Sequence, residues 1–271
     1  MPPPAFLLQA LAHDESHPLI TLTYAQSLDA SIAGRNREQI RLSGEESMLM
    51  THWMRTLHDG IMVGVGTAIA DDPRLNVRLL PQAEHSRTPQ PIILDPKCRL
   101  PTTARLFTTL KDPETPHAKP PWIICRKDNA NFNDLGDDGF QRRRQALVEA
   151  GARLLEVDMR DDNRLDLSKL PSLLEELGIK SLMVEGGAEI IRQFAAYRIP
   201  NDMRLEENPH RLMTKARPLV DRLIVTVAPV FVPDGYSVRS LPGEKAAESM
   251  HEHVRTEISG RDAVMVFRAK K

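Results

Sequence analysis

The sequence predicts an α/β fold with a mostly parallel central sheet, flanking helices and an antiparallel edge. Two observations lead to this fold class. Strand-like apolar runs alternate with helix-like runs along most of the 271 residues, as they do in sheets built from parallel crossover units. No clear helix separates the last two strand-like runs, at 221–227 and 263–268, and this favours an antiparallel strand at one edge.

The strand-like runs are short and apolar, and turn-forming or polar residues bound them. In chain order they cover 19–25, 60–65, 91–94, 122–125, 153–157, 181–184, 221–227 and 263–268. The helix-like runs cover 45–58, 140–150, 167–177 and 188–197. In the first of these helices, Ser43 is the expected N-cap. An apolar stripe facing the core is formed by Met50, Trp53, Met54 and Leu57.

The domain organisation is predicted to be simple. Residues 1–17 are expected to form an N-terminal arm, and residues 18–271 a single domain. Three polar segments that contain proline, near 81–91, 111–121 and 200–218, are predicted to be insertions on the surface of that domain rather than linkers.

Composition excludes several classes of protein. The net charge of −1 gives no overall basic field that would attract nucleic acid or anionic membranes. The start of the sequence is not expected to be a secretory signal, and the sequence holds no apolar run of about 18 residues for a spanning helix. Cys98 and Cys125 are expected to be buried apolar side chains rather than a disulfide framework. These features favour a cytoplasmic location.

The most informative motif is Met183-Val184-Glu185-Gly186-Gly187-Ala188. It is typical of a strand that ends in a carboxylate, followed by a tight turn and a helix. Glycines let the backbone approach a phosphate, and the N–H groups that open a helix favour an anion. Glu185 would lie at the carboxyl end of its strand, where open α/β sheets bind their ligands. An ordinary strand–helix turn is the alternative interpretation.

A second glycine motif, Gly64-Val65-Gly66-Thr67, begins like a dinucleotide fingerprint. The third glycine position holds Ile69, however, and Asp71-Asp72-Pro73 is expected to end any helix within one turn. A conventional Rossmann site is therefore disfavoured. A short helical turn would still direct the Thr67 hydroxyl toward a phosphate and Asp71 toward ribose or amide groups.

Polar residues on the 45–58 helix and after the second glycine motif predict a binding surface for a phosphorylated or polyhydroxylated ligand. Ser47, Thr51 and Arg55 share one helix face, and an Arg aligned with two hydroxyls suits such a ligand. Asn76 and Arg78 share one side if their segment is extended. A solvated helix face is the alternative for the first set.

Three further signals are weak. The polar residues that follow the first strand are also explained by a turn with Asp29 and Gly34 as turn formers. Arg126-Lys127 is either a cation pair for a ribose 2′-phosphate or a solvated basic turn. The tight pair His251-x-His253 is predicted to lie in a solvated loop, and no metal site is expected.

Four motifs in register resemble one known family. They are Leu22-Thr23-Tyr24-Ala25-Gln26-Ser27-Leu28-Asp29, Gly64-Val65-Gly66-Thr67 with Ala70-Asp71-Asp72-Pro73-Arg74-Leu75-Asn76-Val77-Arg78, Val184-Glu185-Gly186-Gly187-Ala188, and Asp221-Arg222-Leu223 leading into Ala228-Pro229. The family is the 2,5-diamino-6-ribosylamino-4(3H)-pyrimidinone 5′-phosphate reductases of riboflavin biosynthesis, in their free-standing fungal or archaeal form. These enzymes are related to the reductase domain of the bacterial bifunctional deaminase–reductase.

The resemblance implies a dihydrofolate-reductase-like fold, NADPH as hydride donor and a homodimer. The residues that it implies for NADPH are Ala25, Thr67, Asp71, Val157, Gly186, Gly187 and Ala188. Those that it implies for the substrate are Ser47, Arg55, Leu75, Asn76, Arg78 and Glu185. Leu49 stands where bacterial relatives have a Trp against the cofactor. The deaminase zinc motif is absent from the sequence, so only the reductase half is implied.

The expected reaction is hydride transfer to C1′ of the ring-opened ribosylamine, which gives a ribitylamino side chain. Arg55 and Arg78 are expected to bind the substrate phosphate. Glu185 is expected to bind the pyrimidine or ribityl end and is the candidate catalytic residue for handling a proton. Two alternatives stay open: another NADPH reductase of this fold with a folate or pterin substrate, and a non-catalytic nucleotide-binding protein.

Overall fold

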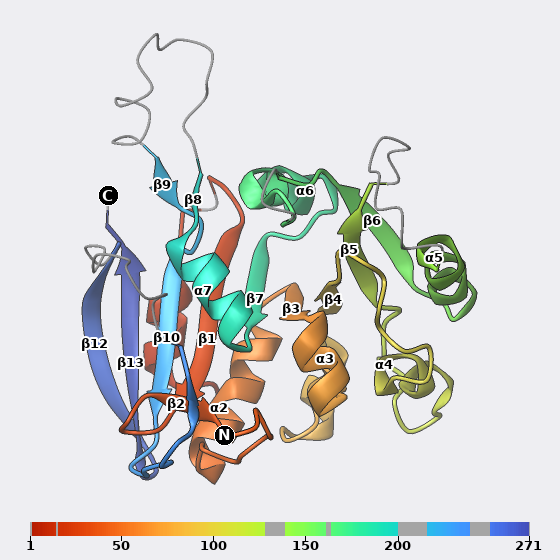
Figure 1. Cartoon of the computed structure of the whole chain (residues 1–271). Coiled ribbons are helices and arrows are strands. Elements are labelled where there is room, and N and C mark those ends of the chain that lie inside the picture. The colour runs from red at the N-terminus through yellow and green to blue at the C-terminus, as the bar shows by residue number, and fades with distance from the viewer. Residues whose placement is uncertain are drawn as a thin grey trace, which may run out of the picture.

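A nine-stranded sheet forms the centre of the computed structural model, which describes residues 2–14, 16–127, 139–160, 164–199, 216–238 and 250–270. The strand order is β12-β13-β10-β1-β7-β3-β4-β5-β6 (Figure 1). The strands from β10 to β6 run parallel, and β13 and β12 continue the sheet in antiparallel fashion. The predicted fold class is therefore confirmed, including its antiparallel edge.

The strands of this sheet are β1 (Leu19–Gln26), β3 (Gly60–Gly64), β4 (Gln90–Leu94), β5 (Trp122–Arg126), β6 (Arg153–Val157), β7 (Ser181–Glu185), β10 (Arg222–Val227), β12 (His251–Ser259) and β13 (Asp262–Ala269). Two small pairs accompany it: β2 (Ser31–Ala33) with β11 (Tyr236–Ser237), and β8 (Arg198–Ile199) with β9 (Arg217–Pro218). All eight predicted strands are present, with ends that differ by at most one residue.

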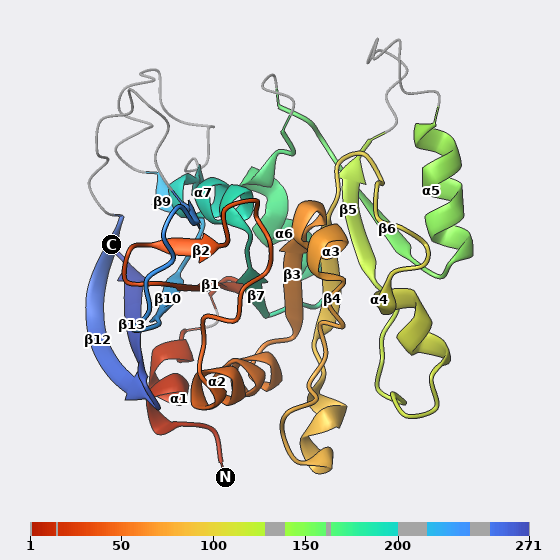
Figure 2. The same ribbon diagram turned by 60° about the horizontal axis from the view of Figure 1, so that its bottom comes forward.

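The helices are α1 (Ala5–Leu11), α2 (Glu45–Thr56), α3 (Val65–Asp71), α4 (Arg105–Thr108), α5 (Phe140–Glu149), α6 (Leu170–Glu176) and α7 (Ala188–Ala196). They cover both faces of the sheet, and Figure 2 shows α1 and α2 on the opposite side from α7. Successive residues of β7 serve the two faces: Leu182 and Val184 join the cluster under α6 and α7, and Met183 joins the cluster under α1 and α2. Burial on both faces explains the continuous apolar runs of the central strands.

The prediction for His251 and His253 is wrong, because both residues lie on β12 rather than in a solvated loop. Among the described strands, β12 pairs with β13 alone and forms one edge of the sheet, and charged residues are interspersed with exposed apolar ones along it. Such polar edge strands carry little of the apolar signal that marks a central strand. His251 is buried, and its Nε2 lies 2.8 Å from the Val220 carbonyl oxygen.

The predicted 1–17 arm contains helix α1, whose Leu7, Ala10 and Leu11 are buried. The predicted insertion at 81–91 contains a 3₁₀ helix, Gln82–Arg87, and the 111–121 segment is mostly exposed loop. Residues 200–215 of the third predicted insertion lie outside the described residues. None of the helices in the described ranges is both long and apolar enough to cross a membrane.

Candidate functional site

Three neighbouring strands bring the predicted motifs to the same edge of the sheet. β1 and β7 are parallel with Thr23 opposite Glu185, and β3 follows with Met62 opposite Val184. The carboxyl ends of all three strands therefore meet at one edge, and this edge is where open α/β sheets bind ligands. Ala25 lies at the end of β1, next to this group.

The double-glycine turn after β7 packs against the start of α3. Gly187 is the N-cap of α7 and offers no side chain to the first N–H groups of that helix. A Cβ atom added at Gly187 would lie only 2.7 Å from the Thr67 hydroxyl oxygen. The predicted strand, turn and helix are confirmed, and the turn leaves the helix N–H groups available to a ligand.

α3 is longer than predicted, because it runs from Val65 to Asp71 rather than for one turn. It ends where the Asp-Asp-Pro sequence predicts, and Asp72 adopts a left-handed conformation with φ 41°. Asp71, at the end of the helix, is half-buried, and burial raises the pKa of its carboxyl group above the ordinary value.

Arg55 and Glu185 form a two-pronged ion pair at the centre of the site. The Arg55 Nε donates to Glu185 Oε1 at 3.1 Å, and Nη2 lies 3.0 Å from both carboxylate oxygens. The Arg55 side chain is 8% exposed and that of Glu185 is 23% exposed. The sequence predicts both residues at the site but not their pairing, because α2 and β7 are distant in the chain.

The segment that carries Asn76 and Arg78 lies against α2. The Arg55 Nη1 donates to the Asn76 carbonyl oxygen at 2.8 Å, and the Arg78 backbone N–H donates to His52 Nδ1 at 3.2 Å. Within the described part of the chain, the buried Asn76 Oδ1 atom has no hydrogen-bond partner. The Leu75 side chain is buried in a core cluster and is therefore not available to a ligand.

Ser47 does not join this group. Its hydroxyl is fully buried and donates to the Ser259 carbonyl oxygen at 3.3 Å. Ser47 precedes Arg55 by eight positions, which is about 12 Å along a helix. The alternative of a solvated face for this stripe is wrong, since both Ser47 and Arg55 are buried.

Val157 lies far from Glu185, at the end of β6, four strand positions from β7. This spacing is about 19 Å, a separation that only an elongated ligand spans. Arg126 is its neighbour on β5, with the guanidinium 4.2 Å from the centre of the Phe140 ring. Lys127 pairs with Asp158 at 2.8 Å, so its charge is already partly compensated.

A turn explains Asp29, and the predicted N-cap of α2 is displaced by one residue. Asp29 accepts hydrogen bonds from the Ser27 hydroxyl and the Val232 backbone N–H, as expected of a turn former. Gly44 rather than Ser43 is the N-cap of α2, and its N–H donates to Asp262 Oδ2 at 2.8 Å. The cap comes from the β12–β13 hairpin, which the local sequence does not reveal.

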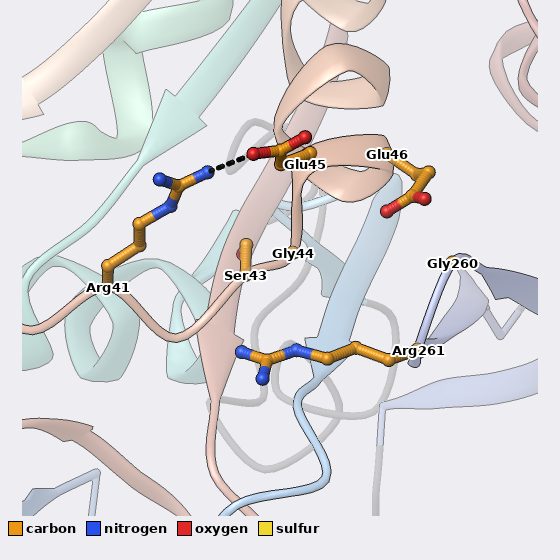
Figure 3. Close-up of a pocket in the computed structure, with 7 residues that line it drawn as sticks. All are labelled: Arg41, Ser43, Gly44, Glu45, Glu46, Gly260 and Arg261. Atoms are coloured by element: carbon orange, nitrogen blue, oxygen red, sulfur yellow. Dashed lines mark ion pairs between the residues drawn. The ribbon is translucent and has the colours of Figure 1, made fainter.

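A pocket of about 440 Å³ lies beside this helix start (Figure 3). Its lining includes Arg41 and Arg261, and Arg41 pairs with Glu45 at 4.0 Å. None of the predicted site residues lines it. Across the described residues, no group of three or more His, Cys, Asp and Glu side chains is placed to hold a metal ion.

Sequence reasoning missed His52, which lies on α2 one turn before Arg55 and whose Nδ1 accepts a hydrogen bond from the Arg78 backbone N–H. It also missed Thr88, whose hydroxyl oxygen accepts from the Val77 N–H at 3.3 Å. The spacing of His52 and Arg55 by three positions was an available signal, because residues so spaced share a helix face.

Residues 18–212 match the model of the family described as the RibD C-terminal domain. The chain belongs to this family. It is 36% identical over 230 residues to the 2,5-diamino-6-ribosylamino-4(3H)-pyrimidinone 5′-phosphate reductase of Debaryomyces hansenii, which covers 82% of this chain and 80% of the relative. The Archaeoglobus fulgidus protein of the same name is 30% identical over 198 residues, covering 71% and 80%.

Among solved structures, the Saccharomyces cerevisiae riboflavin biosynthesis reductase Rib7 is similar, with a TM-score of 0.66 and 25% identity. The match covers 98% of this chain and 99% of that one. The resemblance is confirmed, and so is the predicted α/β fold with a mostly parallel central sheet, flanking helices and an antiparallel edge. The family implies an oxidoreductase that uses a nicotinamide cofactor and a small-molecule substrate.

Proposed function

We propose that this chain is the NADPH-dependent reductase of riboflavin biosynthesis that converts the ribosylamino side chain of a diaminopyrimidinone 5′-phosphate into the ribitylamino form. The observation that carries the proposal is the meeting of the Arg55–Glu185 pair, Asn76 and the double-glycine turn at one sheet edge. The names of the fungal and archaeal relatives support the substrate.

The double-glycine turn fits a dinucleotide phosphate, because Gly187 leaves a space beside Thr67 that any Cβ would fill. We assign NADPH to this turn, with Thr67 and Gly187 at a phosphate and Asp71 at hydroxyl or amide groups. Ala25, Gly186 and Ala188 complete this part of the site, and Val157 marks its far end. When bound, the cofactor supplies the hydride that reduces the sugar carbon C1′.

For the substrate phosphate, Arg78 is the better-placed cation. Arg78 is an exposed residue overall, and partial burial of its guanidinium and the nearby Arg55 charge lower the pKa of that group. Its guanidinium forms no hydrogen bond or ion pair within the described residues, whereas Arg55 is engaged by Glu185 and by the Asn76 carbonyl. The unpartnered Asn76 Oδ1 is an acceptor suited to an amino group of the pyrimidine. Leu75 and Ser47 contribute indirectly, because both side chains are buried. Leu75 contributes through the position of its backbone, and Ser47 through its hydrogen bond to Ser259, which helps to position α2.

Arg55 holds the Glu185 carboxylate in one orientation. Each carboxylate oxygen has two acceptor positions, so Glu185 can bind a substrate N–H or O–H while it stays paired. Glu185 remains the proposed catalytic residue, acting on the proton that accompanies reduction. The Arg55 contribution to phosphate binding is then electrostatic rather than a direct contact.

The proposal is tested by following oxidation of NADPH with the ribosylaminopyrimidinone phosphate as substrate. We expect turnover with this substrate, none with dihydrofolate, and a preference for NADPH over NADH. Turnover of dihydrofolate alone would assign the chain to folate or pterin reduction. Binding of the dinucleotide without turnover of either substrate would support a non-catalytic protein.

Glu185→Gln tests the role of the carboxylate. The amide keeps the shape but weakens the pairing with Arg55 and cannot take up a proton, so kcat is expected to fall by roughly 10²-fold or more. Glu45→Gln, on an exposed first-turn acid of α2, is the matched control and should leave kcat and KM unchanged. Unaltered kcat and KM in Glu185→Gln would remove this residue from both proposed roles.

The proposal also includes a homodimer and a cytoplasmic location, as expected of the family. Sedimentation of the purified protein at several concentrations measures the first, and a dissociation constant above working concentrations would contradict it.

A further inference from the structure

The backbone of the Asn76–Arg78 segment is held by hydrogen bonds to three side chains, two of which come from helix α2. The Asn76 carbonyl accepts from Arg55 Nη1 at 2.8 Å, the Val77 N–H donates to Thr88 Oγ1 at 3.3 Å, and the Arg78 N–H donates to His52 Nδ1 at 3.2 Å. Three consecutive residues are thus fixed in space, and their direction determines where the Asn76 and Arg78 side chains point.

His52 holds the backbone of Arg78, whose guanidinium forms no ion pair within the described residues. Its side chain is fully buried on α2, and its Nδ1 accepts a hydrogen bond, so the ring proton lies on Nε2. That Nε2 atom is buried without a hydrogen-bond partner in the described residues. An unpaired buried donor opposes folding, so packing alone does not account for a histidine at this position.

The surroundings of His52 keep the imidazole neutral. Burial first, and then the nearby charges of Arg55, Arg78 and His85, lower the pKa of His52 to about 3. A protonated ring would have no free Nδ1 lone pair for the Arg78 N–H and would repel both guanidinium groups. The hydrogen bond from the Arg78 N–H to His52 Nδ1 is therefore intact at neutral pH.

We propose that His52 is a positioning residue for substrate binding, which fixes the Arg78 backbone and so aims the Arg78 guanidinium at the substrate phosphate. This inference rests on the proposed function, because it assigns His52 to the same substrate site. His52 itself contacts neither substrate nor cofactor.

The first measurement is the KM for the ribosylaminopyrimidinone phosphate in His52→Leu and His52→Asn. The leucine variant leaves the Arg78 N–H without an acceptor, and KM is expected to rise about tenfold or more. The asparagine Oδ1 falls near the position of the imidazole Nδ1, so His52→Asn should recover most of the affinity. The KM for NADPH should stay within about twofold of the wild-type value in both variants, because the cofactor turn is untouched.

A matched control separates positioning from general damage. His58 is also buried and lies two residues beyond the end of α2. Its ring nitrogens contact the Met54 carbonyl oxygen and Thr21 Oγ1 rather than the Asn76–Arg78 segment. His58→Leu should lower the melting temperature and leave the substrate KM unchanged. If His52→Leu does not fold, as judged by circular dichroism, His52→Met replaces it as an acceptor-free variant with an adaptable side chain.

The decisive test is a double-mutant cycle. If His52 acts through Arg78, His52→Leu raises KM strongly in the wild-type background and little in Arg78→Ala. An equal increase in both backgrounds, or an unchanged KM in His52→Leu, overturns the inference.

The same variants distinguish a failure of the positioning role of His52 from a failure of the proposed function. Binding of ribose 5-phosphate, measured by calorimetry, should weaken in Arg78→Ala and His52→Leu and recover in His52→Asn. If wild type binds ribose 5-phosphate and NADPH but does not turn over the pyrimidine, the proposed function fails while the binding data still decide the role of His52. If binding is equal in wild type and His52→Leu, the positioning role fails, whatever the reaction.

Discussion

At Gly187 the main chain and the Thr67 hydroxyl are so close that a methyl group would displace the hydroxyl. Gly187→Ala should therefore weaken NADPH binding about tenfold while changing the melting temperature little, since the Thr67 side chain can rotate away. Equilibrium titration with NADPH measures the effect.

Gly66 provides the control for this change. It lies in α3, and an added Cβ would meet nothing within 4 Å. Gly66→Ala is expected to stabilise the protein by about 0.5–1 kcal/mol, because alanine restricts the unfolded chain. Equal losses of NADPH affinity in both variants would contradict a specific role for the space beside Thr67.

Local sequence patterns mark some residues of the candidate site and not others. The Glu185 carboxylate, the double glycine and Arg55 carry local signals, and all lie at the expected edge. The Arg55–Glu185 pair depends on how α2 crosses the sheet, and 130 positions separate the two residues. The one signal for His52 was its spacing of three positions from Arg55, and a histidine on a partly apolar helix is otherwise typical of a core position.

Helix α2 begins under the β12–β13 hairpin. Asp262 is fully buried, and its Oδ2 accepts from the Gly44 N–H at the helix start. Asp262→Ala should lower the free energy of unfolding by about 1–2 kcal/mol, because it leaves that N–H without an acceptor. Urea denaturation measures the loss.

Asp262→Asn keeps an acceptor oxygen and should retain most of the stability. Glu45→Ala, at an exposed acid in the same helix turn, should cost only a few tenths of a kcal/mol. A similar loss in Asp262→Asn and Asp262→Ala would show that the charge, rather than the hydrogen bond, stabilises the helix start.

The predicted elements agree best with the structure where apolar periodicity is strong. The central strands and α2, α5 and α7 follow from their residue patterns, since burial on one or both faces imposes those patterns. β12 and α1 were not predicted. β12 is polar because one side and one edge are exposed, and α1 follows three prolines and spans only seven residues.

Considered as a whole, the molecule should lose stability in mild acid. Burial lowers the pKa of His58 from 6.5 to about 4 and that of His52 to about 3. The unfolded chain takes up these protons near pH 6.5 and the folded chain does not, so stability is full above pH 6.5 and falls as the pH drops toward 4. Each histidine contributes a slope of about 1.4 kcal/mol per pH unit in that window.

Urea denaturation at several values between pH 7 and pH 4 measures this slope. His58→Leu starts from a lower stability but should show a flatter dependence on pH, because one of the two histidines is gone. The same slope in wild type and His58→Leu would exclude His58 as a source of the acid sensitivity.

The position of β1 in the sheet has a consequence for biosynthesis. This strand, near the start of the chain, pairs with β7 and β10, which are made more than 150 residues later. The block of β3, β4, β5 and β6 has its partners close in sequence and can assemble while the ribosome is still translating. β1 stays unpaired until β7 (Ser181–Glu185) has emerged and gains its second partner only with β10 (Arg222–Val227), and before then it exposes an apolar surface that chaperones recognise.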